Sequence, residues 1–197
     1  MRYQFLIDTY ETERLKVLSV WSMFREEDLP IRPRSDDARG RNVLEHMIHQ
    51  STGEDGWFRT MLGIDVGERP LPPTEDRMSF IRHYAVLSEK RLEALRTKPD
   101  KWWEAEVKFF DVNRSRAWVM VRRIAHTSHH RGQQMAMLRM LGRDLHSNYG
   151  PTADTGGLPA NGAPVIYAHP NENMLLEDRE KSELAGRSTK PVTERPS

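Results

Sequence analysis

Two histidines stand four residues apart in a stretch that otherwise has the apolar pattern of one long helix. They are His126 and His130, and the segment around them holds three of the eight histidines in the chain. At 3.6 residues per turn, a spacing of four is a rotation of about 40°, so both rings leave the same helix face about one turn apart. The two side chains could therefore bind one ion together.

The helix face that carries this pair is predicted to point inward. Val119 lies seven residues before His126, and Met137 lies seven residues after His130, so apolar residues share the line of the pair. Burial of two imidazoles is costly unless all ring nitrogens find partners, and a divalent cation supplies one partner for each ring. The alternative is a pair that is hydrogen-bonded to the backbone or to carboxylates. We prefer the metal interpretation.

The neighbours of the pair have simpler interpretations. His129 points about 60° to the other side and is predicted to lie at the rim of a site. Arg131 is expected to form salt bridges at the surface, and Gln133 is expected to be a polar neighbour of the site. No catalytic residue is assigned. Glu45 or Glu54 could assist as a base or support a ligand, and each is also explained as a solvated helix charge.

A third ligand must come from another helix, because one helix cannot direct three side chains at one tetrahedral centre without distortion. The helix predicted over residues 42–62 offers His46 and His49. Helical phase slightly favours His46, which lies nearer the apolar stripe. His49 instead shares a face with Gly53 and Gly56, which would permit a close approach of helices. Spacing leaves this choice open, and each could also be an ordinary surface histidine.

Three neutral histidines would leave Zn²⁺, Ni²⁺ or Fe²⁺ with its full charge and at least one open coordination position, which is typical of catalytic sites. Such a metal lowers the pKa of a bound water towards neutrality or holds a thiol as its thiolate. The chain has no cysteine. This composition excludes disulfides, thiolate ligands and a cysteine nucleophile, so a metal would be held by nitrogen and oxygen.

Four amphipathic helices are predicted to position these side chains. Apolar residues recur at helical spacing over about residues 3–25, 42–62, 74–96 and 113–141. Asn42 is a predicted N-cap, Thr74 opens the third helix and Gly142 closes the fourth. Residues 102–110 alternate between apolar and polar types, which predicts a short strand or an extended connector. The fold class is therefore all-α, and an antiparallel four-helix bundle is the simplest way to bury four apolar stripes.

The chain is predicted to divide near residue 150. Its 197 residues suit one domain with a substantial core, which we place in residues 1–150. In residues 151–197, Pro, Gly, Asn and charged residues dominate and apolar periodicity is lost, so this segment is predicted to be an irregular, extended and partly disordered tail. Within the tail, residues 165–167 could dock on the bundle.

Composition argues against nucleic acid and membrane as partners. Thirty basic and 29 acidic residues give a formal charge of +1, and no long block of like charge is present. No stretch approaches the length of about eighteen apolar residues that a membrane span needs, and the N-terminus lacks the features of a secretory signal. We expect a soluble, cytoplasmic protein. Phosphate-binding, dinucleotide-binding and nucleophile-elbow motifs are absent too, as is H-E-x-x-H.

Residues 126–133, with the sequence HTSHHRGQ, resemble the H-x-x-H-H-R-G-Q signature of the DinB/YfiT-like superfamily of metal-dependent four-helix-bundle proteins. In that family an apolar run and Leu-Gly follow, as they do here up to Gly142. A second similarity lies on the predicted second helix. The family has a histidine followed five residues on by an acid and eight on by an aromatic, and His49, Glu54 and Trp57 fit this pattern.

This resemblance covers about residues 3–142 and implies His49, His126 and His130 as the metal triad, which places His49 ahead of His46. It also implies the bundle, a divalent metal and frequent homodimers. Relatives include thiol-dependent S-transferases and isomerases that use low-molecular-weight thiols.

We therefore expect a metal-dependent thiol S-transferase or hydrolase that acts on small electrophiles, with a low-molecular-weight thiol as a candidate substrate. The alternative is a non-catalytic stress-response or partner-binding module in which a structural metal only joins two helices. Similarity of fold alone does not choose between these functions.

Overall fold

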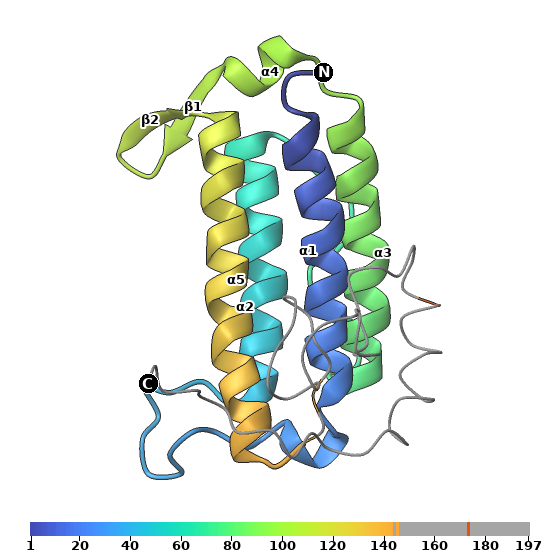
Figure 1. Cartoon of the computed structure of the whole chain (residues 1–197), viewed down its shortest axis with the longest axis vertical. Coiled ribbons are helices and arrows are strands. Elements are labelled where there is room, and N and C mark those ends of the chain that lie inside the picture. Colours follow the sequence, from blue (N-terminus) through green and yellow to red (C-terminus); the bar gives the residue numbers. More distant parts are fainter. Residues whose placement is uncertain (144, 146–172, 174–197) are drawn as a thin grey trace, which may run out of the picture.

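A computed structural model describes residues 1–143, 145 and 173 of the chain, and most of the predicted tail, including residues 165–167, lies outside the described residues. The elements in chain order are α1 (Gln4–Met23), η1 (Glu26–Asp28), α2 (Val43–Trp57), η2 (Phe58–Leu62), α3 (Arg77–Arg96), α4 (Asp100–Glu104), β1 (Glu106–Phe109), β2 (Val112–Ser115) and α5 (Arg116–Met140). The long helices α1, α2, α3 and α5 lie side by side (Figure 1). The predicted four-helix bundle is confirmed. None of the helices in the described part combines the length and the apolar composition that a membrane span requires.

The helix directions differ from the simple antiparallel order that we expected. In Figure 1, α1 and α5 run downwards whereas α2 and α3 run upwards. Ion pairs between the first and last helical regions agree with this, because Glu13 pairs with Arg131 and Asp28 pairs with Arg143. Residues 63–76 must therefore return along the bundle. Fourteen extended residues reach about 46 Å, which exceeds the roughly 30 Å length of a twenty-residue helix.

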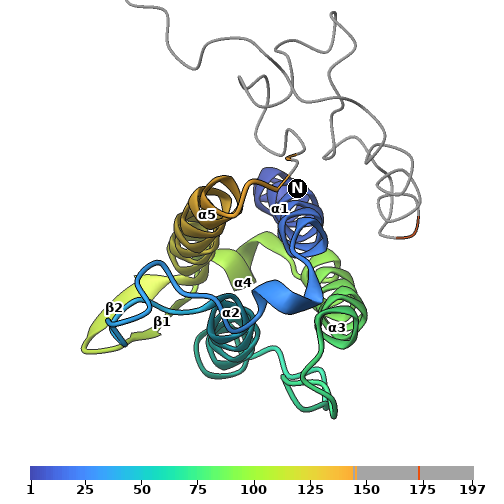
Figure 2. The same ribbon diagram turned by 90° about the horizontal axis from the view of Figure 1, so that it is seen from below.

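Seen from one end, the four helices occupy the corners of a square (Figure 2). α1 packs against α3 and α5, and α2 completes the square between α5 and α3. The α2–α5 side is the one beside which the β1–β2 hairpin lies. In this arrangement one side of α2 faces one side of α5, so side chains from the two helices can meet.

The start of α2 is fixed by reciprocal hydrogen bonds. The backbone N–H of Glu45 donates to Asn42 Oδ1 (2.7 Å), and the backbone N–H of Asn42 donates to Glu45 Oε2 (2.8 Å). This capping box confirms Asn42 as the N-cap and commits the Glu45 carboxylate to the helix end. After Trp57 the helix continues as the π-helical η2 and stops at Gly63, whose φ of 67° is the left-handed conformation that favours glycine.

The third and last helices begin later than we predicted. α3 is capped by Asp76 rather than Thr74, because Asp76 Oδ1 accepts a hydrogen bond from the backbone N–H of Ser79 (2.8 Å). α5 is capped by Ser115, whose Oγ accepts from the backbone N–H of Trp118 (3.2 Å). In both cases the residue that satisfies a free N–H of the first turn sets the helix start.

The region between α3 and α5 forms a hairpin that we predicted only in part. β1 is the alternating segment expected within residues 102–110, and it pairs antiparallel with β2. Phe109 lies opposite Val112, so a two-residue turn of Phe110 and Asp111 joins the strands. Residues 113–115 belong to β2 and not to the fourth helix, because their backbone groups pair with β1. The end of α5 agrees with the prediction, since α5 stops just before Gly142.

The core consists of two apolar clusters at different heights of the bundle. The first includes Leu18, Trp21, Phe24, Met47, Phe80 and Leu138, and the second includes Ile7, Phe58, Leu62, Leu92, Trp103 and Val119. Buried polar side chains occupy the positions between the clusters on every helix, among them Glu13, Glu54, Arg91, Arg123 and Arg131. A polar layer therefore crosses the middle of the bundle.

Candidate metal centre

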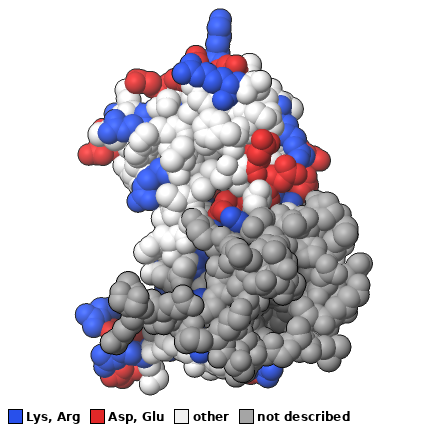
Figure 3. All heavy atoms as spheres, in the orientation of Figure 1, with Lys and Arg blue, Asp and Glu red and all other residues white. Residues whose placement is uncertain are grey.

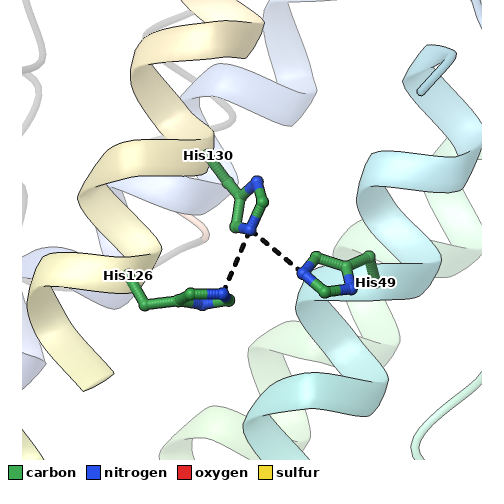
Figure 4. Close-up of side chains that lie close together, drawn as sticks. All are labelled: His49, His126 and His130. Atoms are coloured by element: carbon green, nitrogen blue, oxygen red, sulfur yellow. Dashed lines mark hydrogen bonds between the residues drawn. The ribbon is translucent and has the colours of Figure 1, made fainter. Parts of the chain in front are cut away.

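Three histidine rings meet between α2 and α5, at the edge of the polar layer. His49 comes from α2, and His126 and His130 come from α5 (Figure 4). Nε2 of His130 lies 3.0 Å from Nε2 of His49 and 3.2 Å from Nε2 of His126. One nitrogen of each ring lies within 4.8 Å of a nitrogen of the other two. We call these residues the histidine cluster.

The two nitrogen separations that involve His130 fit a shared metal ion. With metal–nitrogen bonds of about 2.0–2.1 Å, two imidazole nitrogens are roughly 3.3–3.4 Å apart at the tetrahedral angle and about 2.9 Å apart at a right angle. The observed separations of 3.0 and 3.2 Å lie between these values. Within the described part of the chain, no fourth histidine or carboxylate joins the cluster, so the residues present would leave coordination positions open.

Local sequence explains why the rings converge. The i, i+4 pair leaves α5 from one face, as its spacing predicted, and α2 is the neighbour of that face. One turn beyond His49, Gly53 faces Arg123 of α5, and a Cβ at Gly53 would lie 3.5 Å from the Arg123 guanidinium. A side chain there would therefore be in contact with α5. No atom lies within 4 Å of a Cβ built on Gly56, so this glycine is not required for close packing.

His46 is not part of the cluster, although helical phase favoured it. Its side chain is 4% exposed, and its ring centroid lies 5.7 Å from that of His130. Its Nδ1 has no hydrogen-bond partner among the described residues. Phase correctly predicted that His46 is the more buried of the two candidates. The cluster, however, lies at the margin of the buried face, where the half-buried His49 points.

Two side chains contact the outer nitrogens of the α5 histidines. Nδ1 of His130 donates a hydrogen bond to Gln133 Oε1 (2.9 Å), which fixes the proton on Nδ1 and leaves a lone pair on Nε2. This confirms Gln133 as a neighbour of the site. Nδ1 of His126 accepts from Nη1 of Arg123 (3.4 Å). We did not single out Arg123 from the sequence, although its position three residues before His126 places it on the same helix face.

Glu54 is the centre of a buried network rather than a base at the cluster. Its carboxylate accepts hydrogen bonds from the hydroxyls of Tyr10 (2.7 Å) and Tyr84 (2.9 Å) and from Nη1 of Arg91 (3.4 Å). Burial, and then the negative charge of Glu54, raise the pKa of both tyrosines well above the ordinary value. Arg123 links Glu54 to the histidines, because its Nη2 lies 4.0 Å from Glu54 Oε2 and its Nη1 contacts His126.

Arg131 is buried, whereas we predicted a surface group. It is 3% exposed and forms an ion pair with Glu13 of α1, which also accepts a hydrogen bond from Ser128 Oγ (3.1 Å). Burial alone would raise the pKa of Glu13, but the charge and hydrogen bond of Arg131 outweigh it, so this pKa lies below its ordinary value. His129 is exposed, with its ring centroid 5.1 Å from that of His130, which agrees with a position at the rim.

Burial and nearby charges keep the histidine cluster neutral at pH 7. Burial, and then the positive charge of Arg41, lower the pKa of His49 to about 4. Burial and the Arg123 charge lower that of His126 to about 3. Burial also lowers the pKa of His130, although its hydrogen bond to Gln133 acts in the opposite direction. Neutral imidazoles are the form that binds metal, so at neutral pH the rings carry no charge that would oppose a cation.

Comparison with known proteins agrees with the resemblance seen in the sequence. A sequence profile described as the DinB family matches residues 6–156. The chain belongs to the DinB family. Its structure is similar to the crystal structure of a DinB-like protein from Bacillus cereus ATCC 10987, with a TM-score of 0.56 and 22% identity over 68% of this chain and 88% of that chain. At this identity the likeness shows a shared DinB-like fold. No curated protein matches the chain.

Proposed function

We propose that this DinB-family protein binds a divalent metal ion, Zn²⁺, Ni²⁺ or Fe²⁺, through Nε2 of His49, His126 and His130, and that it is a thiol S-transferase or hydrolase for small electrophiles. The convergence of three neutral imidazole nitrogens carries this proposal. A divalent metal with an open coordination position supplies Lewis-acid activation of a thiol or a water.

The protein's own residues would hold and orient the ligands. Gln133 fixes the ring of His130 and its tautomer, and the lowered pKa values keep protons from competing with the metal. His49 and His126 are only half-buried, so a small molecule can approach the cluster. Because the chain has no cysteine, a thiol that reacts here must come from a separate molecule, and we propose that this molecule is a low-molecular-weight thiol.

Replacement of one cluster histidine tests metal binding directly. We expect His126→Ala to lose most of the metal found in protein that is purified without a metal-affinity step, because two ligands remain. It should also lose transfer of glutathione or cysteine to 1-chloro-2,4-dinitrobenzene. Elemental analysis gives the metal content. His83→Ala is the matched control, since this histidine of α3 contacts the Arg69 carbonyl outside the cluster and its loss should change neither quantity. Full metal content and undiminished thiol transfer in His126→Ala would overturn the proposal.

Chelation separates this function from a module in which the metal only joins α2 and α5. A structural metal that is bound only by the folded state adds its binding free energy to folding, so its removal should lower stability by several kcal/mol. For a catalytic site we expect EDTA to abolish thiol transfer with a small change in the free energy of unfolding. A large loss of stability, without any activity in the metal-loaded protein, would favour the structural role.

A further inference from the structure

Four aromatic side chains form a continuous surface that begins at the histidine cluster and ends at the tip of the β1–β2 hairpin. They are Trp57, Phe109, Phe110 and Trp118, and we call them the aromatic wall. Trp57 stacks on His126, with ring centroids 5.7 Å apart and an interplanar angle of 27°. Edge-to-face contacts then join Trp57 to Phe109 (5.3 Å) and Phe109 to Trp118 (4.9 Å). Figure 1 shows the hairpin beside the adjoining ends of α2 and α5.

The tip of the wall has an unfavourable backbone conformation. Phe110 has a φ of 53°, and it is the one non-glycine residue with positive φ in the described part of the chain. A bulky residue in this left-handed region is strained, and glycine would be the natural choice for such a turn. Phe110 is also 70% exposed, so its ring adds little to the core. Its ring nevertheless lies 6.4 Å from that of Trp57. The strained turn therefore extends the wall instead of stabilising the fold.

The inner part of the wall is anchored and the outer part is accessible. Trp57 and Phe109 pack against the second apolar cluster of the core. Trp118 is 41% exposed, and the guanidinium of Arg114 lies 5.3 Å from its ring centroid. Phe110 and Trp118 therefore offer the exposed surface of the wall, and aromatic rings that are held in place can bind an apolar group with little loss of side-chain freedom.

The size and the position of the wall favour a small ligand over a protein partner. A complete aromatic side chain contributes about 150–250 Å², and part of this wall is already buried. A stable protein interface needs roughly 1,000 Å² or more. The wall also starts in contact with His126, so a molecule whose reacting group lies at the cluster would place an adjoining apolar group on these rings.

We infer that the aromatic wall binds an aryl-sized apolar group of the substrate while the reacting atom lies at the histidine cluster. This inference rests on the proposed function and narrows it, because it assigns the substrate to the class of electrophiles that carry an aromatic or similarly large apolar group. Small, fully polar electrophiles would be poor substrates.

Paired hydroxamates test the inference on the Zn²⁺-loaded protein. Acetohydroxamate contains the metal-binding group with only a methyl group attached. Benzohydroxamate and 3-phenylpropionohydroxamate add a phenyl ring at two different distances from that group. We expect at least one aryl compound to bind about tenfold more tightly than acetohydroxamate, as aromatic contacts of this kind contribute. Titration calorimetry and quenching of tryptophan fluorescence measure the affinities.

Substitution at the wall should remove the gain from the aryl group and nothing else. In Phe110→Gly, which also relieves the left-handed strain, and in Trp118→Ala, acetohydroxamate should bind as in the wild type while the advantage of the aryl compounds falls. Phe5→Ala is the matched control, because Phe5 is an exposed aromatic (59%) on α1 outside the wall. Circular dichroism and the melting temperature report whether each variant is folded.

The outcomes distinguish the two levels of the proposal. If acetohydroxamate binds but no aryl compound gains affinity, or if Phe110→Gly and Trp118→Ala both keep the gain, the wall inference is wrong and the metal site stands. If no hydroxamate binds the Zn²⁺-loaded protein, the metal has no open position for a substrate, and both the catalytic proposal and the wall inference fail. A third outcome is that the aryl compounds bind no more tightly than acetohydroxamate and that Phe110→Gly abolishes self-association measured by sedimentation. The wall would then be an interface for a second copy of the chain, which also overturns the inference.

Discussion

Arg123 is a buried cation that contacts a candidate metal ligand. Histidines that bind metal commonly donate their outer N–H to a carboxylate or a carbonyl, but the outer nitrogen of His126 faces a guanidinium, which can only donate. This contact places the proton of the neutral His126 ring on Nε2, the atom that is turned towards His130. Metal binding through Nε2 therefore requires that this proton move and that the Arg123 contact loosen.

We accordingly predict that Arg123→Gln binds metal more tightly than the wild type. A unit charge within about 8 Å of another like charge costs about 2 kcal/mol at an effective dielectric constant of 20, and a glutamine oxygen could accept the Nδ1 proton. The expected gain is about thirtyfold. Competition with a chromophoric chelator measures it. The exposed Arg122→Gln is the control and should change the affinity much less. Equal or weaker metal binding by Arg123→Gln would contradict this account.

The histidine cluster also makes the stability of the metal-free protein depend on pH. The pKa values of His49 and His126 are lowered to about 4 and about 3, whereas an unfolded histidine titrates near about 6.5. Between these pH values the unfolded state binds more protons, so the free energy of unfolding falls as the pH decreases through about 6.5. Urea unfolding of the metal-free protein at pH 7, 6 and 5 should show this decrease. In His49→Gln the decrease should be shallower, and an unchanged slope would argue against the lowered pKa.

At the scale of elements, the sequence predicted helix ends wherever a short-range signal was strong. Asn42 and Glu45 have the spacing of a capping box, and Gly142 adopts the positive φ expected after a helix. The start of α3 was less well determined, because Thr74 and Asp76 are both residue types that cap helices. Only the folded chain shows which of them meets the N–H of Ser79.

The hairpin shows what the sequence could not predict. Residues 112–115 contain one apolar residue and do not alternate between apolar and polar types. The turn before them, Phe110 and Asp111, lacks the usual glycine or asparagine. Their strand conformation depends on pairing with β1. The direction of α3 was equally hidden, since it depends on whether residues 63–76 turn back at once or travel the length of the bundle.

Loss of the capping box should weaken α2 without removing its histidine from the cluster. We predict that Asn42→Ala lowers the free energy of unfolding by about 1 kcal/mol, because the hydrogen bond from the Glu45 backbone N–H to the Asn42 side chain is lost. Chemical denaturation measures the change, and metal content should stay the same. Asn42→Asp retains an N-cap acceptor and should be close to the wild type. A drop of several kcal/mol for Asn42→Ala would show that the cap does more than end the helix.

At the scale of the whole molecule, the fold brings together side chains that are far apart in the sequence. The i, i+4 pair was visible in the sequence, whereas spacing left His46 and His49 open. The family resemblance chose His49, and the placement of α2 beside α5 gives the physical reason. The burial of Arg131 needed its partner Glu13, which is 118 residues away. Local spacing can predict which side chains share a helix face, whereas contacts between helices depend on packing.

The distribution of charge gives a prediction about partners. The net charge is +1, and on the face in Figure 3 the described surface carries basic and acidic side chains together with broad uncharged areas. Affinity for nucleic acid comes largely from basic groups that displace counterions from phosphates. We therefore expect no shift of a DNA duplex or a single-stranded RNA in a gel at 50 mM salt and micromolar protein. A salt-sensitive shift would reveal a basic surface that the net charge conceals.

The distance along the chain between the cluster residues has a consequence for folding kinetics. His49 and His130 are 81 positions apart, and the crossover of residues 63–76, α3 and the hairpin all lie between them. Closing so long a loop has a high entropy cost and requires non-local contacts, which form slowly compared with local helical contacts. During refolding, the helices can therefore form well before three nitrogens are in place for one ion. Metal uptake would report the arrival of α5 beside α2, and an added metal would slow unfolding more than it speeds folding.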